Sequence, residues 1–447
     1  MKISRIAKLC LFGCTLVTST LATSALAADV TLTVDDVKTS NGQILASLCD
    51  DPQAVFPGSC RTYAARAPAQ AGATIVIFKD VKPGTYAIQV AHDENGNGRP
   101  DFPQEGFAFG NDMAFPPTFA GASIAVSGDT AAHVRLLHMP SNGASNIATN
   151  GVPPPMGVIK TDLRDDGLYG ELYVPAARKE PLPLLIAIGG SEGGLDIMSS
   201  YTAAFAQHGY AVLALAWWKE PGLPQSIENV PLEYFDRAIA WAKARPEIAP
   251  GRIAMLGWSR GAEAALLVAA RNRDIHGVIG VAPSAFVWTG LNFASPGASK
   301  SAWTVAGVPL PHVTPGPFRP GAPMAQMFMD SLAIADARPE VSIPVENIQA
   351  PVLLLSGSDD RLWPSNEMAQ RIGGRLRARN FAYSFEHKNY EGAGHSIFLG
   401  DPAAPRRPGS ASIDAFMGGS AEANGAARAD SWQRVLRFLD VALKPKG

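Results

Sequence analysis

The chain has 447 residues, of which 47% are hydrophobic and 17% are charged. This length and composition are typical of a globular protein with two or three domains, and they exclude an intrinsically disordered chain. The formal net charge is −2, and the basic residues form no footprint of the kind that nucleic-acid binders need. We therefore expect no nucleic-acid partner.

Residues 1–27 have the pattern of a signal peptide. Three basic residues precede an apolar stretch over residues 9–22, and residues 25–27 form an A-x-A cleavage signal. The alternative is a lipoprotein signal with Cys14 as the lipidated residue. The short apolar run before Cys14 argues against this alternative. No other stretch approaches the length of a membrane span. We predict cleavage after Ala27 and a periplasmic or secreted protein without a membrane span.

Two cysteines, Cys49 and Cys60, remain after that cleavage. In an oxidising compartment, two cysteines this close in sequence form a disulfide more often than a metal or catalytic site. The sequence therefore predicts a Cys49–Cys60 disulfide, and it contains no zinc-type cluster of ligands.

Residues 28–138 form the first predicted domain, a small all-β sandwich. Short β-type runs separated by turn formers indicate this architecture. The runs cover residues 30–34, 44–48, 73–78, 85–90 and 132–136. On residues 80–87 and 92–98, the segment resembles a family of small secreted β-sandwich domains with no assigned chemistry.

Within this domain, one segment has the ligand spacing of a calcium loop. Asp93, Asn95, Asn97 and Asp101 stand at positions 1, 3, 5 and 9, and Gly98 stands at position 6. Position 12 holds a glutamine instead of the usual bidentate glutamate, and no helix is predicted on either side. Two interpretations therefore stay open, a Gly/Asn-rich turn between strands or a loop that binds Ca²⁺.

Residues 139–156 are rich in turn formers and are predicted to be a linker, and residues 157–447 form the second predicted domain. In it, strands and helices alternate, which predicts an α/β fold with a mostly parallel sheet and helices on both faces. The predicted strands cover residues 157–162, 167–174, 184–188, 211–216, 252–256, 275–281, 352–356 and 382–387. The predicted helices cover residues 198–208, 233–245, 261–271, 365–376 and 431–443. Sites in such sheets lie at the carboxyl ends of the strands.

Two Gly-x-Ser-x-Gly motifs follow predicted strands, one centred on Ser191 and one on Ser259. This motif forms a tight turn that exposes a nucleophilic serine, and the fold then requires an acid and a histidine downstream. Two acids end the strand at 352–356, and His395 follows the next strand in a Gly-rich loop, whereas the rival His387 lies inside a predicted strand. Chain order therefore favours Ser259 as the nucleophile.

The segment around Ser191 is then predicted to be an oxyanion loop. A backbone N–H from around Gly190 or Ser191, together with the N–H of Arg260, would give a hole with two donors.

Residues 157–447 resemble the C-terminal catalytic domain of acyl-CoA thioester hydrolases and bile acid–CoA:amino acid N-acyltransferases, within the α/β-hydrolases. The matching stretches are residues 189–194, 231–235, 257–263, 356–360 and 392–395. The resemblance implies that the acid is Asp360 and that Asp359 is a neighbouring turn acid. The β domain replaces the Ig-like domain typical of those enzymes, and a serine nucleophile instead of cysteine argues for hydrolysis. An exported chain seldom meets CoA, which argues against acyl-CoA as the substrate.

These features predict an exported serine hydrolase that cleaves a small-molecule ester or thioester and requires no cofactor. His395 would take the Ser259 proton, Asp360 would orient the imidazole, and water would cleave the acyl-enzyme. Residues 283–344 are predicted to be an insertion whose aromatic residues form either a lid and acyl pocket or ordinary packing. The alternatives are a glycan- or surface-binding protein with a degenerate hydrolase fold, and a peptidase or lactone hydrolase on the same scaffold.

Overall fold

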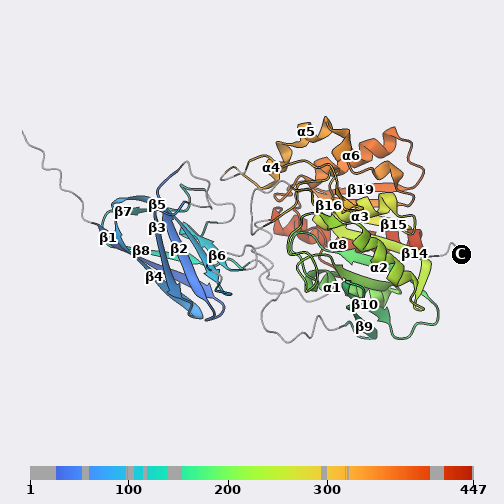
Figure 1. The fold of residues 1–447 in the computed structure, drawn as a ribbon, viewed down its shortest axis with the longest axis horizontal. Coiled ribbons are helices and arrows are strands. Elements are labelled where there is room, and N and C mark those ends of the chain that lie inside the picture. The colour runs from blue at the N-terminus through green and yellow to red at the C-terminus, as the bar shows by residue number, and fades with distance from the viewer. Residues whose placement is uncertain are drawn as a thin grey trace, which may run out of the picture.

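A computed structural model shows a β domain followed by a larger α/β domain (Figure 1). It describes residues 27–52, 60–96, 98, 105–113, 118–138, 154–292, 300–317, 319, 322–402 and 417–444. Residues 1–26 of the predicted signal peptide, nearly all of the predicted linker, and the calcium-loop residues Asn97 and Asp101 lie outside these ranges. No helix in the described ranges is long and apolar enough to cross a membrane.

The β domain consists of two sheets packed face to face, as predicted. One sheet has the order β4 (Gly72–Val81), β1 (Ala28–Val37), β8 (Thr130–Arg135). The other has the order β3 (Tyr63–Pro68), β2 (Gln43–Cys49), β5 (Gly84–Asp93), β6 (Phe107–Phe109), and β7 (Ser123–Val126) pairs with β5. Alternate residues of β1, among them Val30, Leu32 and Val34, are fully buried against the facing sheet. This alternation is the reason why β1 could be predicted from its sequence.

The predicted disulfide between Cys49 and Cys60 is present. The two Cα atoms lie 5.4 Å apart, and 11 positions separate the residues in the sequence. Cys49 ends β2, and Cys60 precedes β3, which pairs with β2 through Leu48 and Tyr63. The bond therefore closes the connection between two adjacent strands.

The α/β domain contains an eight-stranded sheet whose order is β19-β18-β15-β14-β11-β12-β10-β9. The strands are β9 (Val158–Leu163), β10 (Tyr169–Pro175), β11 (Leu182–Ile188), β12 (Ala211–Ala216), β14 (Ile248–Trp258), β15 (Gly277–Val281), β18 (Val352–Gly357) and β19 (Phe385–Tyr390). β10 is antiparallel to both β9 and β12, and the six strands from β12 to β19 are parallel. The predicted mostly parallel α/β-hydrolase sheet is confirmed.

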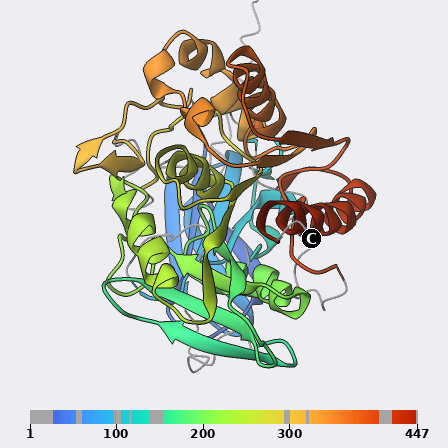
Figure 2. The same ribbon diagram turned by 90° about the vertical axis from the view of Figure 1, so that its right-hand side faces the viewer.

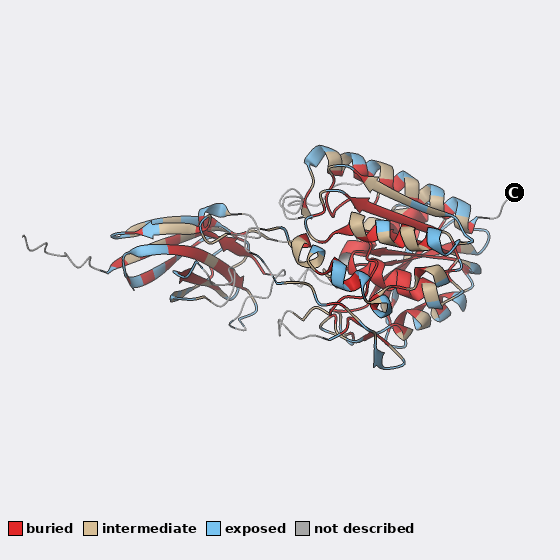
Figure 3. Ribbon diagram, turned by 90° about the horizontal axis from the view of Figure 1, so that it is seen from above, coloured by how far each residue is buried: buried red, intermediate tan, exposed pale blue. Residues whose placement is uncertain are grey.

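Helices cover both faces of this sheet (Figures 2 and 3). They are α1 (Asp196–Thr202) with the 3-10 turn η2 (Ala203–His208), α2 (Glu233–Lys243), α3 (Arg260–Arg271), α6 (Ser365–Ala378) and α8 (Ala421–Leu443). Because both faces are covered, every residue of β12, β15 and β18 is buried, which explains their unbroken apolar runs.

Helix α8 begins ten residues before its predicted start at residue 431. Ser420 is the N-cap and accepts a hydrogen bond from the N–H of Ala423 at 3.1 Å. The first turns of α8 bury Asn424 and Arg428, which are polar, so the hydrophobic periodicity on which the prediction depended is absent there.

The insertion between β15 and β18 contains only short elements in its described part. They are β16 (Trp303–Val305), β17 (Val308–Pro309), α4 (Ala325–Met329), α5 (Leu332–Asp336) and the 3-10 turns η3 (Pro339–Val341) and η4 (Val345–Asn347), and β16 pairs with β13 (Val230–Pro231). Trp288 and Trp303 are fully buried, which fits the alternative in which the aromatic residues of the insertion serve ordinary packing.

Candidate active site

Four loops meet at the carboxyl edge of the parallel strands, and each carries a residue that the sequence singled out. Gly190 follows β11, Ser259 follows β14, Asp360 follows β18, and His395 follows β19. β11 and β14 are adjacent in the sheet, as are β18 and β19, so the sheet brings these segments to one edge.

Ser259 lies in a strained turn between β14 and α3. Its φ of 57° and ψ of −120° are unusual for a residue with a side chain, and its N–H donates to the carbonyl of Val281 at 2.9 Å. A Cβ at Gly257 would lie 2.1 Å from the Gly261 oxygen, and a Cβ at Gly261 would lie 2.3 Å from the Gly189 oxygen. Both glycines of the motif are therefore required by close backbone contacts. Such strain costs about 1–3 kcal/mol and clusters at functional sites.

Asp360 and His395 form a buried hydrogen-bonded pair. His395 Nδ1 lies 2.8 Å from Asp360 Oδ2, which also accepts the Ser365 hydroxyl at 2.6 Å. Asp360 Oδ1 accepts the backbone N–H groups of Leu362 and Trp363 at 3.0 and 3.2 Å. These bonds hold the carboxylate in place and assign the proton on the imidazole to Nδ1, which leaves the lone pair on Nε2.

The two rival residues make other contacts. Asp359 Oδ2 accepts the N–H of Gly419 at 2.8 Å, and its side chain is exposed beside Arg361. His387 lies in β19, where its Nε2 is 2.7 Å from the Ser356 hydroxyl and burial lowers its pKa. The structure therefore brings Asp360, and not Asp359, to His395.

The Nε2 atom of His395 is buried and has no hydrogen-bond partner within the described part of the chain. The ring packs between the rings of Trp258 and Trp363, at 5.6 and 6.3 Å between centroids. Ser259 follows Trp258 directly and is 5% exposed, but its hydroxyl does not hydrogen-bond to Nε2. Catalytic hydrogen bonds are often long in the absence of substrate, so this geometry is compatible with a Ser–His pair.

The loop after β11 packs directly against the Ser259 turn. A Cβ at Gly190 would lie 2.8 Å from the Trp258 oxygen and 2.9 Å from Ser259 Cβ. The indole N–H groups of Trp217 and Trp218 donate to the carbonyls of Gly189 and Gly190 at 2.9 and 3.0 Å. Two buried tryptophans thus hold this loop beside the serine.

The predicted oxyanion donors have different surroundings. The Gly190 N–H donates to Glu192 Oε1 at 2.8 Å, so it has an acceptor already. Arg260 is the first residue of α3, where a backbone N–H has no acceptor within the helix. Ser191 lies between Gly190 and Glu192 and is partly exposed.

Glu192 is a residue that the sequence reasoning missed. Although the residue as a whole keeps some exposure, burial of its carboxyl group raises the pKa from the ordinary 4.5 to about 7. The Gly190 N–H, the charge of Lys219 and, when it is protonated, the imidazole of His395 act in the opposite direction. An acid inside a Gly-rich segment at a strand end is the signal that could have identified it.

Comparisons with known proteins show what each of the two domains is similar to. Residues 230–445 match the family described as BAAT / Acyl-CoA thioester hydrolase C terminal. Residues 32–134 match a family described as an uncharacterized protein conserved in bacteria (DUF2141). The α/β domain resembles the C-terminal domain of acyl-CoA thioester hydrolases. The resemblance inferred from the sequence is thereby confirmed for both domains.

Individual relatives are similar over the thioesterase-like domain. Peroxisomal succinyl-coenzyme A thioesterase of Mus musculus is 26% identical over 295 residues, covering 63% of this chain and 65% of that protein. Acyl-coenzyme A thioesterase 6 of Homo sapiens is 29% identical over 303 residues, covering 65% of this chain and 67% of that protein. Among solved structures, esterase B from Lactobacillus rhamnosis aligns with a TM-score of 0.38 and 15% identity, covering 65% of this chain and 87% of that chain.

A second missed feature of the thioesterase-like domain is a buried ion pair next to Ser259. Arg260 Nη1 lies 2.6 Å from Glu263 Oε2, and the other terminal nitrogen of Arg260 donates to the Thr289 carbonyl. Glu263 Oε1 accepts the Trp288 N–H at 3.1 Å and the Trp303 indole N–H at 2.8 Å. Burial raises the pKa of Glu263. The pair therefore joins the first turn of α3 to the insertion, and its i, i+3 spacing is the signal that the sequence offered.

Proposed function

We propose that this chain is an exported serine hydrolase that cleaves a carboxylic ester or thioester through Ser259, Asp360 and His395. One observation carries the proposal. A buried histidine keeps its Nε2 without a partner, has its Nδ1 fixed by Asp360, and packs against the residue that precedes a strained serine. A general base for a nucleophilic serine requires this arrangement.

In the proposed reaction, Ser259 Oγ attacks the acyl carbon while His395 Nε2 takes the hydroxyl proton. The C–O or C–S bond to the leaving group then breaks, and the same proton passes to the departing alcohol or thiol. Water attacks the resulting acyl-enzyme by the reverse sequence of proton transfers, which releases the acid and restores Ser259. Asp360 stabilises the imidazolium that forms in both steps.

The developing oxyanion would lie at the N-terminus of α3. The N–H of Arg260 and the partial positive charge of the helix end both favour negative charge there. The second donor would come from Ser191 or Gly190. Because Glu192 accepts the Gly190 N–H, that group becomes a donor to substrate only when the Glu192 carboxyl moves away.

The acyl group is proposed to be apolar. The indole rings of Trp258 and Trp363 flank His395, and Phe328 of the insertion packs on Trp363 with centroids 5.8 Å apart. The names of the relatives indicate thioesterases that act on coenzyme A thioesters. An exported chain would meet other esters or thioesters, so we propose acyl transfer to water without CoA as the leaving group.

A fluorophosphonate probe tests the nucleophile. We expect the purified protein to be labelled and to hydrolyse short p-nitrophenyl esters, and Ser259→Ala to lose both activities. Ser191→Ala is the matched control, since it changes the other Gly-x-Ser-x-Gly motif and should keep the labelling. Equal labelling of Ser259→Ala and the wild type would refute the assignment. Absence of labelling, and of turnover on ester, thioester, lactone and peptide panels, would favour a binding protein.

A further inference from the structure

The turn that follows β5 contains a buried carboxylate that is only half satisfied. Asp93 ends β5 and is fully buried. Its Oδ2 accepts the Gly98 N–H at 3.0 Å and the Gln43 side-chain amide at 2.9 Å. Its Oδ1 is buried and has no hydrogen-bond partner, and no lysine or arginine of the described residues forms an ion pair with it. An unpaired buried oxygen on an anionic group is costly unless something binds there.

A second carboxylate holds the same turn. Glu105 is 7% exposed, and its Oε1 accepts the N–H groups of Glu94 and Asn95 at 2.9 and 3.4 Å. The preceding loop also packs closely here, since a Cβ at Gly42 would lie 1.9 Å from the Asp93 carbonyl oxygen. Two buried acids therefore meet on one tightly packed turn in the β domain.

We propose that this turn binds a Ca²⁺ ion through Asp93 Oδ1, with Glu105 as the second carboxylate. The bond from the Gly98 N–H to Asp93 folds the chain around the acid at the first position, and Gly98 has the positive φ of 81° that this turn needs. Asn95 lies at the third position, where calcium loops supply a side-chain oxygen.

The kind of ligands favours calcium over other metals. In the described part of the chain, no group of three or more His, Cys, Asp or Glu side chains could hold a metal. An ion at Asp93 would therefore complete its shell with amide, backbone and water oxygens. Ca²⁺ accepts such mixed, flexible oxygen shells, whereas Zn²⁺ needs nitrogen or sulfur and Mg²⁺ needs strict octahedral geometry.

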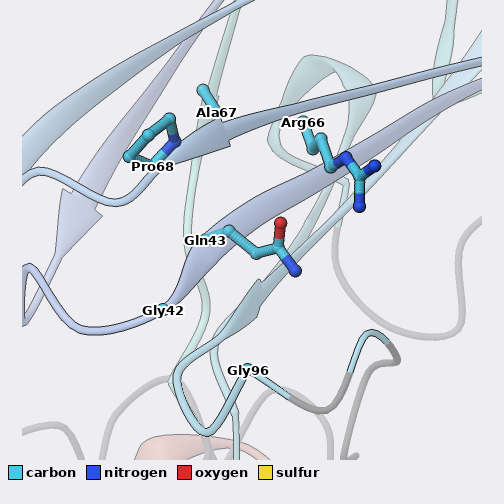
Figure 4. A pocket seen from close by; sticks show the side chains of 6 residues that line it. All are labelled: Gly42, Gln43, Arg66, Ala67, Pro68 and Gly96. Carbon is cyan, nitrogen blue, oxygen red and sulfur yellow. The ribbon is translucent and has the colours of Figure 1, made fainter.

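A surface hollow borders this turn. It has a volume of about 440 Å³ and is lined by Gly42, Gln43, Arg66, Ala67, Pro68 and Gly96 (Figure 4). Gln43 is the residue whose amide donates to Asp93, and Gly96 belongs to the turn itself. Arg66 lines the same hollow but forms no ion pair with Asp93. The hollow therefore borders the turn on the side of Gln43 and Gly96, whereas Asp93 lies buried behind it.

Isothermal titration of the EDTA-treated full chain with CaCl₂ tests the proposal. We expect one Ca²⁺ per chain with a Kd of about 10⁻⁵ to 10⁻³ M, and at least tenfold weaker binding of Mg²⁺. Asp93→Asn should weaken Ca²⁺ binding more than tenfold. Asp80→Asn is the matched control, because Asp80 is an exposed acid of the same domain with a φ of 55° that asparagine tolerates.

The outcomes separate the proposal from its rivals. A wild type that gives no binding heat up to 5 mM Ca²⁺, set at roughly five times the weakest expected Kd, would refute it. Binding of Mg²⁺ as tight as that of Ca²⁺ would refute the choice of ion. Circular dichroism checks that each variant folds, and Glu105→Gln replaces Asp93→Asn if that variant does not. Unchanged Ca²⁺ affinity in the folded variant would place the ion elsewhere.

Discussion

The carboxyl group of Glu192 should make the stability of the α/β domain depend on pH. Burial raises its pKa from the ordinary 4.5 to about 7, so the folded protein holds a proton over a range where the unfolded chain has released it. Because this pKa is raised, the stabilisation that it contributes is complete below pH 4.5 and is lost as the pH rises through 7. The substitution Glu192→Gln removes this titration and keeps an oxygen that can accept the Gly190 N–H.

The size of the effect follows from the two pKa values. At about 1.4 kcal/mol per pH unit, the change from 4.5 to about 7 corresponds to about 3 kcal/mol of unfolding free energy in total. Between pH 5 and pH 8 the wild type should lose about 2.5 kcal/mol through this group. The Glu192→Gln variant should not lose this part of the unfolding free energy. Its stability relative to the wild type should therefore increase as the pH rises.

Urea denaturation at pH 5 and pH 8, followed by tryptophan fluorescence, measures this difference. All eight tryptophans lie between residues 217 and 432, so the signal reports the α/β domain alone. Glu180→Gln is the matched control, because Glu180 is exposed on the same domain and its replacement should leave the pH dependence unchanged. A constant difference in unfolding free energy between Glu192→Gln and the wild type at both pH values would refute the reasoning.

Three further predictions concern the triad, the serine turn and the disulfide. Asp360→Asn should lower kcat about 10³- to 10⁴-fold in ester hydrolysis, and Asp359→Asn should change it less than about threefold, since only Asp360 contacts the histidine. Gly257→Ala should destabilise the fold by about 3 kcal/mol, the upper end of the usual cost of overpacking, because its Cβ would lie 2.1 Å from a backbone oxygen, and thermal melting would detect this. Replacing Cys49 and Cys60 by serine should cost the β domain about 3 kcal/mol in calorimetry, given the 11-residue separation.

Local sequence patterns were sufficient to predict the mostly parallel sheet and the strand ends at which the proposed catalytic residues stand. The second half of β14, from Ile253 to Trp258, and the first four residues of β18 are buried apolar runs. Ser259 directly follows β14, and the pair Asp359 and Asp360 follows one residue after the end of β18. Strand ends of a parallel sheet share one edge, so chain order predicted Ser259, one of two adjacent acids and His395 at the same edge, and the family resemblance selected Asp360 over Asp359. The catalytic roles of these three residues and the oxyanion donors stay predictions that the probe and mutant experiments must test.

The missed residues combine local contacts with contacts to distant segments, which no local pattern contains. Glu192 is two residues from Gly190, but its carboxyl group matters because the fold buries it near His395. In the sequence, Glu263 stands out only as part of the matching stretch 257–263. Its hydrogen-bond donors Trp288 and Trp303 lie 25 and 40 positions away. The i, i+3 spacing of Arg260 and Glu263 could indicate their ion pair, but the contacts with distant segments depend on the fold and could not be derived from spacing along the chain.

Buried side chains form hydrogen bonds to the backbone of the loops around the strained Ser259 turn. A backbone in this conformation persists only if its neighbours hold it, and each neighbouring loop is held by a side chain from another element. Trp217 and Trp218 donate to the loop after β11, and Asn424 of α8 accepts the Gly394 N–H and donates to the Gly418 carbonyl beside the histidine loop. The early, polar start of α8 that the sequence pattern missed is therefore part of what positions His395.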